Sequence, residues 1–571
     1  MQRHVFAPVI AAAILVLLGG DMALQLGRAG ARFMPRLNDT HPALAKFEPE
    51  PGHMQRPRLA RRVVLVIIDG LRLRESIGLP YLDELRSAGI EAMARSHYPT
   101  FSRPNYVSIV TGVPPRDSGV RTNNYDALVR LDSLMDRAHA VGLGAGFVSN
   151  YSPALSRMFT RPATEDERKE TALRYASDFD DSHYVQWPGG FVNAAHLLLA
   201  QGYPLVIMHL GEPDIAGHRF GGDSPEYLAA ARLADRELAA ALKSPDAPSG
   251  DPQSVVDLSR DAVVVVADHG HTDSGGHGGL EEDVVEVPLV LAGAGVRKGA
   301  AVVGARLIDI APTVATLLGT EPPGHGLGRT LVDALELPEG VRQQLAADDA
   351  RRVERNQVIV ASARSDAERE LAAERLWRVP MVLGLFIVGI GLLLLGRKLG
   401  ALRLDWRVLA ISLPAFPVTY YLAIGLLEQH YSPSAIPELG DVMHMLVRWG
   451  LVSTAAQIVV SWIALRGRVV LRERLAAANG LTACGLVLAV LPAGLAWAIF
   501  AQPYLEVPGP SLMVLIPATL LAVAFYAMAS ATTLVLEIVI FFARAVDPRN
   551  HLRRLERAAE RARSRMEDEP D

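Results

Sequence analysis

The chain has 571 residues, is half hydrophobic by composition and carries a formal net charge of −5. This length exceeds that of one ordinary domain, and so small a net charge gives no indication of a nucleic-acid partner. The single cysteine, Cys484, excludes an intrachain disulfide and a thiolate metal site, so any metal must be held by histidines and carboxylates.

The first predicted element is the apolar run VFAPVIAAAILVLLGG, Val5–Gly20. Such a run is typical either of a cleaved signal peptide or of a membrane anchor. Because no clear cleavage site with small residues follows it, we favour an uncleaved anchor over residues 1–26. A linker rich in proline and arginine, residues 27–62, comes next.

Residues 63–340 predict an α/β domain. Short apolar runs rich in valine and isoleucine, such as VVLVIID, PLVIMHL and AVVVVAD, are typical of strands covered on both faces, and therefore of a parallel sheet. Helical patterns lie between them, as over residues 224–243, and LIDIAPTVATLLG predicts a late helix. A loop rich in proline, serine and glycine, residues 244–254, interrupts the domain.

The charged, alanine-rich residues 341–378 predict a helix that leads to the membrane. Five further apolar segments of membrane length follow within residues 379–543. Arginine-rich loops alternate there with loops that contain no lysine or arginine, and the tail, residues 544–571, is again basic. Because positive loops stay in the cytoplasm, we expect six spans in the cytoplasmic membrane, both termini in the cytoplasm and the α/β domain outside. Arg28 and Arg32, just after the first span, argue for the opposite orientation.

Three ionisable residues, His444, Arg448 and Glu537, fall within predicted spans, which makes them functional candidates. For Arg448 we favour the plainer interpretation, in which the side chain reaches toward the lipid headgroups. The basic tail suits anionic lipid, but its main interpretation is topological.

Polar side chains follow the three predicted strands. Because ligand sites in parallel sheets form beyond the carboxyl ends of the strands, we expect these side chains to meet in one crevice. They are three aspartates and three histidines: Asp69, Asp214, His218, Asp268, His269 and His277. Each alone also suits a structural role in a turn or loop, but their joint placement favours a site.

Three carboxylates in one crevice are costly unless cations neutralise them. Oxygen and imidazole ligands suit Zn²⁺, with Mn²⁺ or Mg²⁺ as alternatives. Six ligands exceed the needs of one tetrahedral ion, so we expect two ions about 4 Å apart.

The stretch TFSRPNYVSIVTG places Ser102 at the start of a predicted helix, with Pro104 in its first turn. Alone, this pattern indicates an N-cap serine. A helix N-terminus also attracts phosphate, and a serine hydroxyl beside a metal becomes a nucleophile. Because the predicted ligands lie nearby, we favour the nucleophile. Thr100 is the rival nucleophile, but it lies before the helix begins.

Further residues near these motifs suit phosphate binding or support of the ligands. Arg72 and Arg103 suit the clamping of phosphate oxygens and equally suit structural ion pairs. For His271 and His209 we favour support of the ligands or core packing over ligation.

Five motifs occur in the order found in the alkaline phosphatase superfamily: DGLR at Asp69, PTFSRPN at Pro99, EPDIAGHRFG at Glu212, ADHGHTDSGGHGG at Ala267 and APTVATLLG at Ala311. Over Val63 to about Asp333, nearly half of the chain, the sequence resembles the type I phosphodiesterase/nucleotide pyrophosphatase branch and its relatives, the GPI ethanolamine-phosphate transferases. The resemblance implies an alkaline-phosphatase-like parallel-sheet sandwich outside the membrane, joined to an α-helical transmembrane domain.

The same resemblance implies that Ser102 is the nucleophile and that Asn105 contacts a phosphoryl oxygen. The implied zinc sites are Asp214, His218 and His277 for one ion, and Asp69, Asp268, His269 and Ser102 for the other. Most of the nucleotide pyrophosphatase group has threonine at this serine, whereas serine followed by Arg-Pro resembles the first GPI ethanolamine-phosphate transferase, whose membrane tail is far longer. Sulfatases of the superfamily need arginine where this chain has Tyr106, so we discount a formylglycine sulfatase.

We expect a membrane-anchored, two-metal phosphodiesterase or phosphotransferase that acts through a phosphoserine intermediate on an extracytoplasmic phosphodiester, such as a phospholipid or its headgroup. One alternative is a phosphoethanolamine-type transferase that modifies a glycolipid. Another is a catalytically inactive outer domain of a membrane assembly. The expected partners are the phosphodiester and membrane lipids, without nucleic acid, and the sequence gives no indication of oligomeric state.

Overall fold

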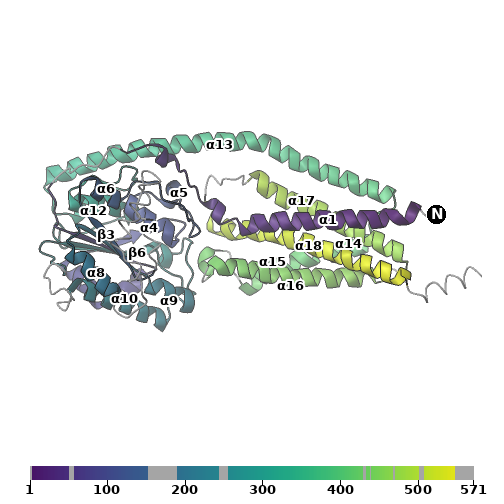
Figure 1. Cartoon of the computed structure of the whole chain (residues 1–571), viewed down its shortest axis with the longest axis horizontal. Helices are drawn as coiled ribbons and strands as arrows, with labels where there is room; N and C mark the ends of the chain where they lie inside the picture. Colours follow the sequence, from purple (N-terminus) through teal and green to yellow (C-terminus); the bar gives the residue numbers. More distant parts are fainter. Residues whose placement is uncertain are drawn as a thin grey trace, which may run out of the picture.

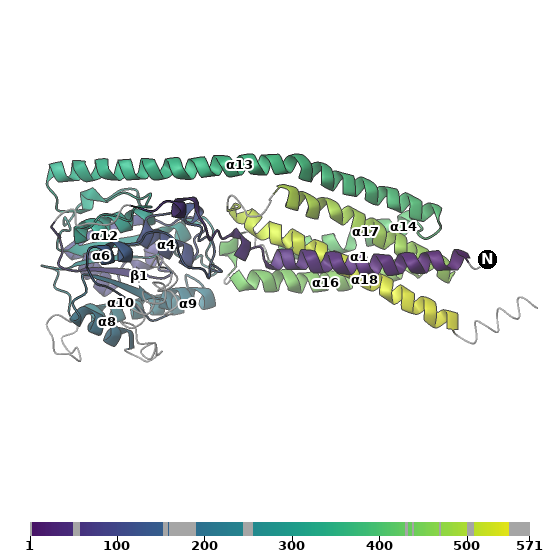
Figure 2. The same ribbon diagram turned by 45° about the horizontal axis from the view of Figure 1, so that its top comes forward.

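The computed structural model describes residues 3–49, 57–151, 158, 190–243, 255–428, 432–436, 439–466, 470–499 and 507–546. A sheet-containing part lies at one end and a bundle of long helices at the other, and one helix, α13 (Glu339–Lys398), runs along both (Figure 1, Figure 2). The loop predicted over residues 244–254 and the tail beyond residue 546 lie outside the described residues.

The sheet has seven strands in the order β3-β4-β1-β5-β6-β2-β7. Their bounds are β1 Val63–Ile68, β2 Gly89–Arg95, β3 Ala145–Ser149, β4 Leu205–Leu210, β5 Ala262–Val266, β6 Glu286–Gly293 and β7 Ala305–Arg306. β3, β4, β1 and β5 are parallel, in a register that pairs Val63 with both Leu205 and Ala262. β6 runs antiparallel to β5 and to β2. The expected parallel sheet is confirmed, with one antiparallel strand within it.

The helices of this part are α2 Leu73–Ser76, α3 Pro80–Ala88, α4 Ser102–Thr111, α5 Pro115–Ser118, α6 Leu134–Ala140, α8 Gly190–Ala200, α9 Glu212–Phe220, α10 Pro225–Lys243, α11 Glu282–Val285 and α12 Ile310–Leu318. α4, α6 and α12 lie on one side of the sheet, and α8, α9 and α10 lie on the other (Figure 1). The helices predicted over residues 224–243 and 307–319 are confirmed, the second with a 3₁₀ turn at its start.

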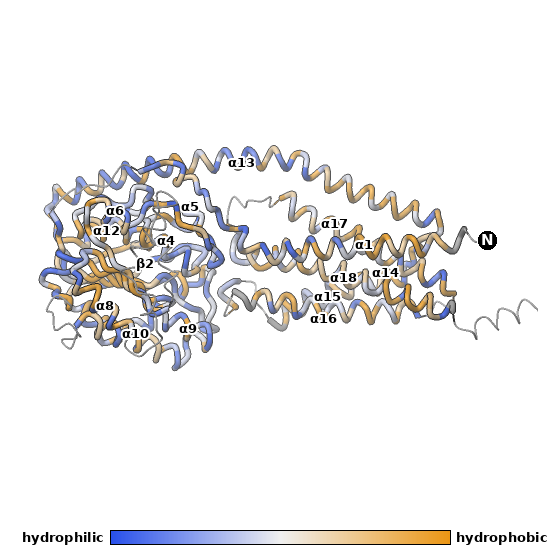
Figure 3. The backbone as a smooth tube through the Cα atoms, viewed as in Figure 1, coloured by the Kyte–Doolittle hydropathy of each residue, from blue (hydrophilic) through white to orange (hydrophobic). Residues whose placement is uncertain are grey.

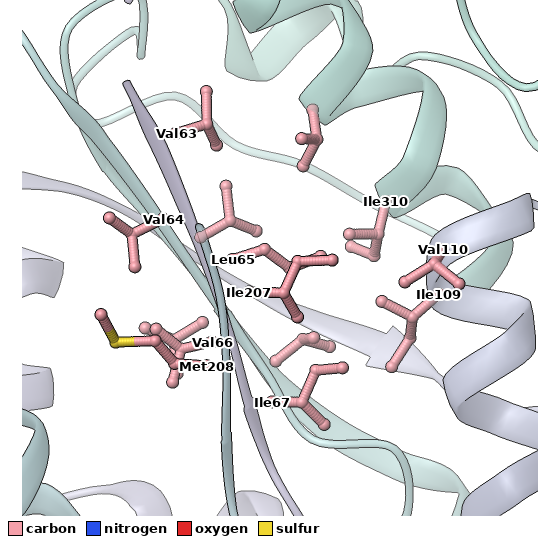
Figure 4. Close-up of a cluster of buried hydrophobic side chains, with 14 of the residues drawn as sticks. Val63, Val64, Leu65, Val66, Ile67, Ile109, Val110, Ile207, Met208 and Ile310 are labelled. Atoms are coloured by element: carbon pink, nitrogen blue, oxygen red, sulfur yellow. The ribbon is translucent and has the colours of Figure 1, made fainter. Parts of the chain in front are cut away.

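The central strands β1, β4 and β5 are buried along their whole length, as their unbroken apolar sequences predict. Successive side chains of a strand point to opposite faces. In β1, Leu65 and Ile67 point toward Ile310 of α12 and toward α4, whereas Val64 and Val66 point to the other face (Figure 4). The two-sided core fixes the strands rigidly, and with them the residues at their carboxyl ends.

The helical bundle is formed by α1 Arg3–Ala31, the second half of α13, α14 Trp406–Ser412, α15 Ala415–Leu422 with a π-helical turn Ala423–Glu428, α16 Leu439–Leu465, α17 Leu471–Ile499 and α18 Pro510–Val546. Within the described chain, six helical stretches are long and apolar enough to cross a membrane, which confirms the predicted number. Figure 3 shows the apolar character of these helices. The chain is therefore a membrane protein, while its orientation and domain boundaries remain predictions.

α18 packs against α1, α16 and α17. Small residues permit close contact between α1 and α18: a Cβ atom at Gly19 would lie 3.3 Å from Ala527 O and from Ala531 Cβ. A Cβ atom at Gly30 would lie 2.9 Å from the Leu521 side chain. Because small residues let membrane helices approach closely, α1 is an integral part of the bundle.

An ion pair joins α17 to α18 inside the bundle. Arg474 donates two hydrogen bonds to the Glu537 carboxylate, at 2.5 and 2.6 Å, and both side chains are almost completely buried. Glu537 is one of the ionisable residues that the sequence singled out, and this contact gives it a structural partner. A buried pair is strongly destabilised when one member loses its charge, because the other charge is then left unpaired.

We therefore expect Glu537→Gln to lower the free energy of unfolding by about 3 kcal/mol or more. Thermal unfolding of the detergent-solubilised chain measures the change. Glu473→Gln is the matched control, since Glu473 pairs with Arg403 at 2.7 Å while both side chains are about half exposed, and such pairs contribute about 1 kcal/mol or less. Equal stability of the two variants would contradict the stabilising role of the buried pair between Arg474 and Glu537.

Candidate active site

The candidate site lies at the carboxyl ends of the central parallel strands. Asp69 directly follows β1, and Asp268 follows β5. β4 leads into α9, whose first and last turns carry Asp214 and His218. His277 lies in the loop between β5 and α11. The structure thus brings together residues that are more than 200 positions apart in the sequence.

One group of potential metal ligands comprises Asp69, Asp268 and His269, whose ligand atoms all lie within 4.8 Å of one another. His269 Nε2 lies 3.3 Å from Asp268 Oδ2 and 3.5 Å from Asp69 Oδ1. The group contains the three side chains that, with Ser102, the family resemblance implies for one ion.

The second group comprises Asp214, His269 and His277. His218 lies beside this group: its Nε2 is 3.3 Å from Asp214 Oδ1 and 3.2 Å from His277 Nε2. His269 belongs to both groups, and its ring stacks on that of His277 with the ring centroids 3.8 Å apart. The two groups therefore adjoin, as a pair of ions requires.

This donor set fits divalent cations. Asp69 Oδ1 and Asp268 Oδ2 are buried and have no hydrogen-bond partner among the described residues, although buried polar atoms are normally paired. Burial raises the pKa of Asp268, and the neighbouring Asp69 carboxylate raises that pKa further. Burial lowers the pKa of His269 and of His277, and the neutral imidazole is the form that binds a metal.

Ser102 is the first residue of α4, and Phe101 occupies the N-cap position. The prediction of an N-cap serine is therefore wrong by one residue, and the N-cap side chain makes no capping hydrogen bond. The Ser102 hydroxyl lies 3.1 Å from His269 Nε2, and the residue is 8% exposed. The hydroxyl thus lies beside the histidine that the two ligand groups share.

Asn105 holds the loop that precedes α4. Its side-chain oxygen accepts a hydrogen bond from the His97 amide at 3.1 Å. Its Nδ2 lies within 3.2 Å of the carbonyl oxygens of His97, Pro99 and Phe101, to which it donates. Both ends of the amide are hydrogen-bonded to the backbone, so Asn105 positions this loop.

Thr100 is also occupied by the backbone. Its hydroxyl donates a hydrogen bond to Gly279 O and accepts one from Gly278 N, each at 2.9 Å. Its carbonyl oxygen accepts a hydrogen bond from His277 Nδ1 at 2.8 Å. Thr100 is fully buried and therefore suits attachment of the His277 loop better than nucleophilic attack.

Arg72 and Arg103 make structural contacts. The guanidinium of Arg72 is fully buried and lies 2.6 Å from the Asp283 carboxylate and 3.0 Å from that of Asp273. The guanidinium of Arg103 donates to the Tyr125 carbonyl. These contacts favour a structural role for both arginines over the binding of phosphate.

Three further side chains hold the ligands in place. His271 forms a 3.1 Å hydrogen bond with Asp214 Oδ1. Tyr106 donates a hydrogen bond to Asp69 Oδ2 and forms a second one with His209 at 2.9 Å. His209 Nε2 also lies 3.3 Å from Asp69 Oδ2, so both histidines contact predicted ligands, and their supporting role stays a prediction. Tyr106 was not predicted as a site residue. The sequence feature that points to it is its position one helical turn after Ser102, which places both residues on the same face of the helix.

The loop before Ser102 contacts the membrane helices. The Tyr98 hydroxyl donates to Pro508 O at 2.5 Å, two residues before α18. Phe101 is buried in an apolar cluster together with Phe33, Leu37, Met513, Ile516 and Leu520. The site therefore lies where the sheet-containing part meets the bundle (Figure 1).

Residues 63–288 match the family model for type I phosphodiesterase / nucleotide pyrophosphatase. GPI ethanolamine phosphate transferase 1 of Yarrowia lipolytica is 26% identical over 269 residues, which cover 42% of this chain and 27% of that protein. A 2,3-bisphosphoglycerate-independent phosphoglycerate mutase of Cereibacter sphaeroides is 32% identical over 148 residues, which cover 24% of this chain and 26% of the mutase. The solved structure of alkaline phosphatase PafA aligns with 49% of this chain and 100% of its own, at 13% identity and a TM-score of 0.36.

The chain thus spans about a quarter of the length of these curated relatives. The family match begins at the first residue of β1 and ends within β6. The matched range includes both ligand groups, Ser102 and the residues that hold the ligands in place. Residues 63–288 therefore form a domain of the type I phosphodiesterase / nucleotide pyrophosphatase family.

Proposed function

We propose that this chain is a membrane-bound phosphoryl-transfer enzyme that moves a headgroup phosphate from a lipid phosphodiester to a hydroxyl acceptor through Ser102. The observation that carries the proposal is the position of the Ser102 hydroxyl, 3.1 Å from His269 Nε2, where the two ligand groups adjoin. The family of the domain supports the reaction type.

The proposal includes two divalent cations. The residues that would hold them are Asp214, His218 and His277 for one, and Asp69, Asp268 and His269 for the other. Zinc suits these nitrogen and oxygen donors, with Mn²⁺ or Mg²⁺ as alternatives. When bound, the cations neutralise the negative charge of the carboxylates and lower the pKa of the serine hydroxyl.

The proposed reaction has two displacements. In the first, the Ser102 oxygen forms a bond to phosphorus as the bond to the lipid alcohol breaks, and the proton lost by the serine balances the proton gained by that alcohol. The headgroup phosphate is then attached to Ser102 as a phosphodiester. In the second, the acceptor oxygen forms a bond to phosphorus as the bond between phosphorus and the Ser102 oxygen breaks, and the proton lost by the acceptor balances the proton that the serine regains.

The remaining residues position these atoms. The N-terminus of α4 offers backbone N–H groups and the positive end of the helix dipole to the phosphoryl oxygens. Asn105 and Thr100 fix the loop that leads into α4. Tyr106 orients Asp69, and His271 orients Asp214. Positioning of this kind supplies much of the rate of phosphoryl transfer.

A lipid substrate is supported by the contact between Phe101, the residue before the nucleophile, and the ends of α1 and α18. These contacts hold the site beside the membrane helices, where a lipid phosphodiester resides. The name of the Yarrowia relative, an ethanolamine phosphate transferase, supports a phosphoethanolamine headgroup and an alcohol as acceptor. A second candidate, hydrolysis with water as acceptor, is favoured by the phosphodiesterase name of the family model.

We expect Ser102→Ala to lower turnover of a lipid phosphodiester by about a thousandfold or more, because no other hydroxyl replaces the nucleophile. Ser108→Ala is the matched control, since Ser108 lies in the same helix and its hydroxyl donates to Pro104 O. Mass spectrometry of the trapped wild-type chain is expected to find the headgroup phosphate on Ser102. Near-normal turnover in folded, zinc-loaded Ser102→Ala would refute the role of this residue.

Tyr106→Phe tests the cation group around Asp69. Loss of the hydroxyl that orients the carboxylate is expected to weaken the affinity for one Zn²⁺ by about tenfold or more. Competition with a chelator measures that affinity without any turnover. Tyr81→Phe is the control, because Tyr81 is also buried but lies in α3, away from the ligands. If Tyr106→Phe binds both zinc ions with the wild-type affinities, the hydrogen bond from Tyr106 does not support Asp69 as a ligand.

The acceptor is tested with phosphatidylethanolamine labelled in its ethanolamine, supplied in vesicles that also contain a glycolipid. Transfer predicts that the label moves to the glycolipid, and hydrolysis predicts that it appears in the aqueous phase. Ser102→Ala is expected to abolish both. Absence of bound cations and of both products in the folded wild-type chain would favour the catalytically inactive domain instead.

A further inference from the structure

The loop that carries His277 rests directly on the membrane region. Its contact is the segment Ser432–Ile436, between α15 and α16, which we call the 432–436 segment. Gly279 N donates a hydrogen bond to Ser434 Oγ at 2.7 Å. Thr272 Oγ1 donates to Ser434 O at 2.9 Å. These two bonds bracket His277 in the sequence.

The approach is close enough to require glycine at the contact. A Cβ atom at Gly276 would lie 2.3 Å from Ser434 O and 2.4 Å from Ile436 O. Both neighbours are backbone atoms and cannot swing away as a flexible side chain can. Gly276 directly precedes His277, so the chain at the ligand is in van der Waals contact with the 432–436 segment.

The opposite side of the loop is held by Thr100. His277 Nδ1 is hydrogen-bonded to Thr100 O, and Gly278 N donates to Thr100 Oγ1. With Nδ1 engaged in this way, Nε2 is the nitrogen of His277 that faces the other ligands, 3.2 Å from His218 Nε2. The loop is therefore clamped between Thr100 on one side and Ser434 on the other.

The 432–436 segment is itself anchored in the bundle. Ser434 is fully buried. Ile436 is buried in an apolar cluster with Phe416 and Tyr420 of α15, Leu446 of α16 and Leu521 of α18. Ser432 Oγ donates to Glu281 Oε1 at 2.8 Å. A continuous set of contacts thus joins the membrane helices to the ligand loop.

We propose that the 432–436 segment is a positioning element of the metal site: Ser434, seated on the membrane helices, fixes the Thr272–Gly279 loop so that His277 is held in place to bind a cation. This inference rests on the proposed function in that it assumes cations at the two ligand groups. It assigns to the membrane region a part in building the site. Partners that orient a ligand typically contribute tenfold to a hundredfold to metal affinity.

The test uses the full-length chain in detergent and Zn²⁺ as the probe, with the affinity of each of two zinc ions measured by chelator competition. Ser434→Ala removes the acceptor for Gly279 N, and Gly276→Ala places a methyl group against Ser434 O. Thr272→Val removes the donor to Ser434 O, whereas Thr272→Ser retains a hydroxyl. We expect the first three variants to lose tenfold or more in the affinity for one zinc while the other zinc is retained, and Thr272→Ser to bind both as the wild type does.

Ser453→Ala is the matched control. Ser453 is fully buried in α16, and its hydroxyl has no hydrogen-bond partner among the described residues, so the same substitution should leave both affinities unchanged. Hydrogen exchange of the peptide that contains Gly279 gives a second readout, expected to accelerate in Ser434→Ala and not in Ser453→Ala.

Wild-type affinity for both zinc ions in folded Ser434→Ala and Thr272→Val would overturn the inference. Equal losses at both ions, or the same loss in Ser453→Ala, would also overturn it, because a general loss of stability would then be the cause. Failure of the proposed function gives a different result, namely retained turnover in Ser102→Ala, and the zinc measurement involves no substrate.

Discussion

The fold brings three carboxylates into one buried space, and the site depends on how their charge is compensated. Asp69, Asp214 and Asp268 meet because parallel strands end at the same edge of a sheet. Withdrawing an ionised carboxylate from water costs several kcal/mol unless an opposite charge compensates it. Burial lowers the pKa of His269 and of His277, which favours the neutral imidazole that binds a metal. A pair of divalent cations is the compensation that suits this arrangement.

Much of this arrangement was predictable because its causes are local in the sequence. An unbroken apolar run of five or six residues specifies a strand with two buried faces, and the residue after such a run lies at the sheet edge. That rule alone placed Asp69 and Asp268 in one crevice with the residues that follow β4. The membrane helices were predictable for the same reason, since their length and apolar composition are properties of single segments.

The rest depends on contacts between distant segments, which no local pattern encodes. The antiparallel direction of β6 follows from the path of the chain between β5 and β6, which reverses through the His277 loop and α11. Ser102 begins α4 instead of capping it, because Phe101 takes the N-cap position while its ring packs on the ends of α1 and α18. Tyr106 becomes a partner of Asp69 only once α4 lies across the end of β1.

Among the described residues, the membrane region contacts two loops of the site, and the positions of these contacts argue that it does more than anchor the chain. The loop before Ser102 is held through Tyr98 and Phe101, and the loop of His277 is held through Ser434. A flexible tether would keep the domain near the bilayer without fixing either loop. Because a displacement of about 1 Å can slow a positioned reaction a hundredfold, seating both loops on the same bundle sets their mutual geometry. In the proposed function the substrate is a lipid phosphodiester at the bilayer surface, so the contacts that hold Ser102 and the His277 loop also fix their distance from that proposed substrate.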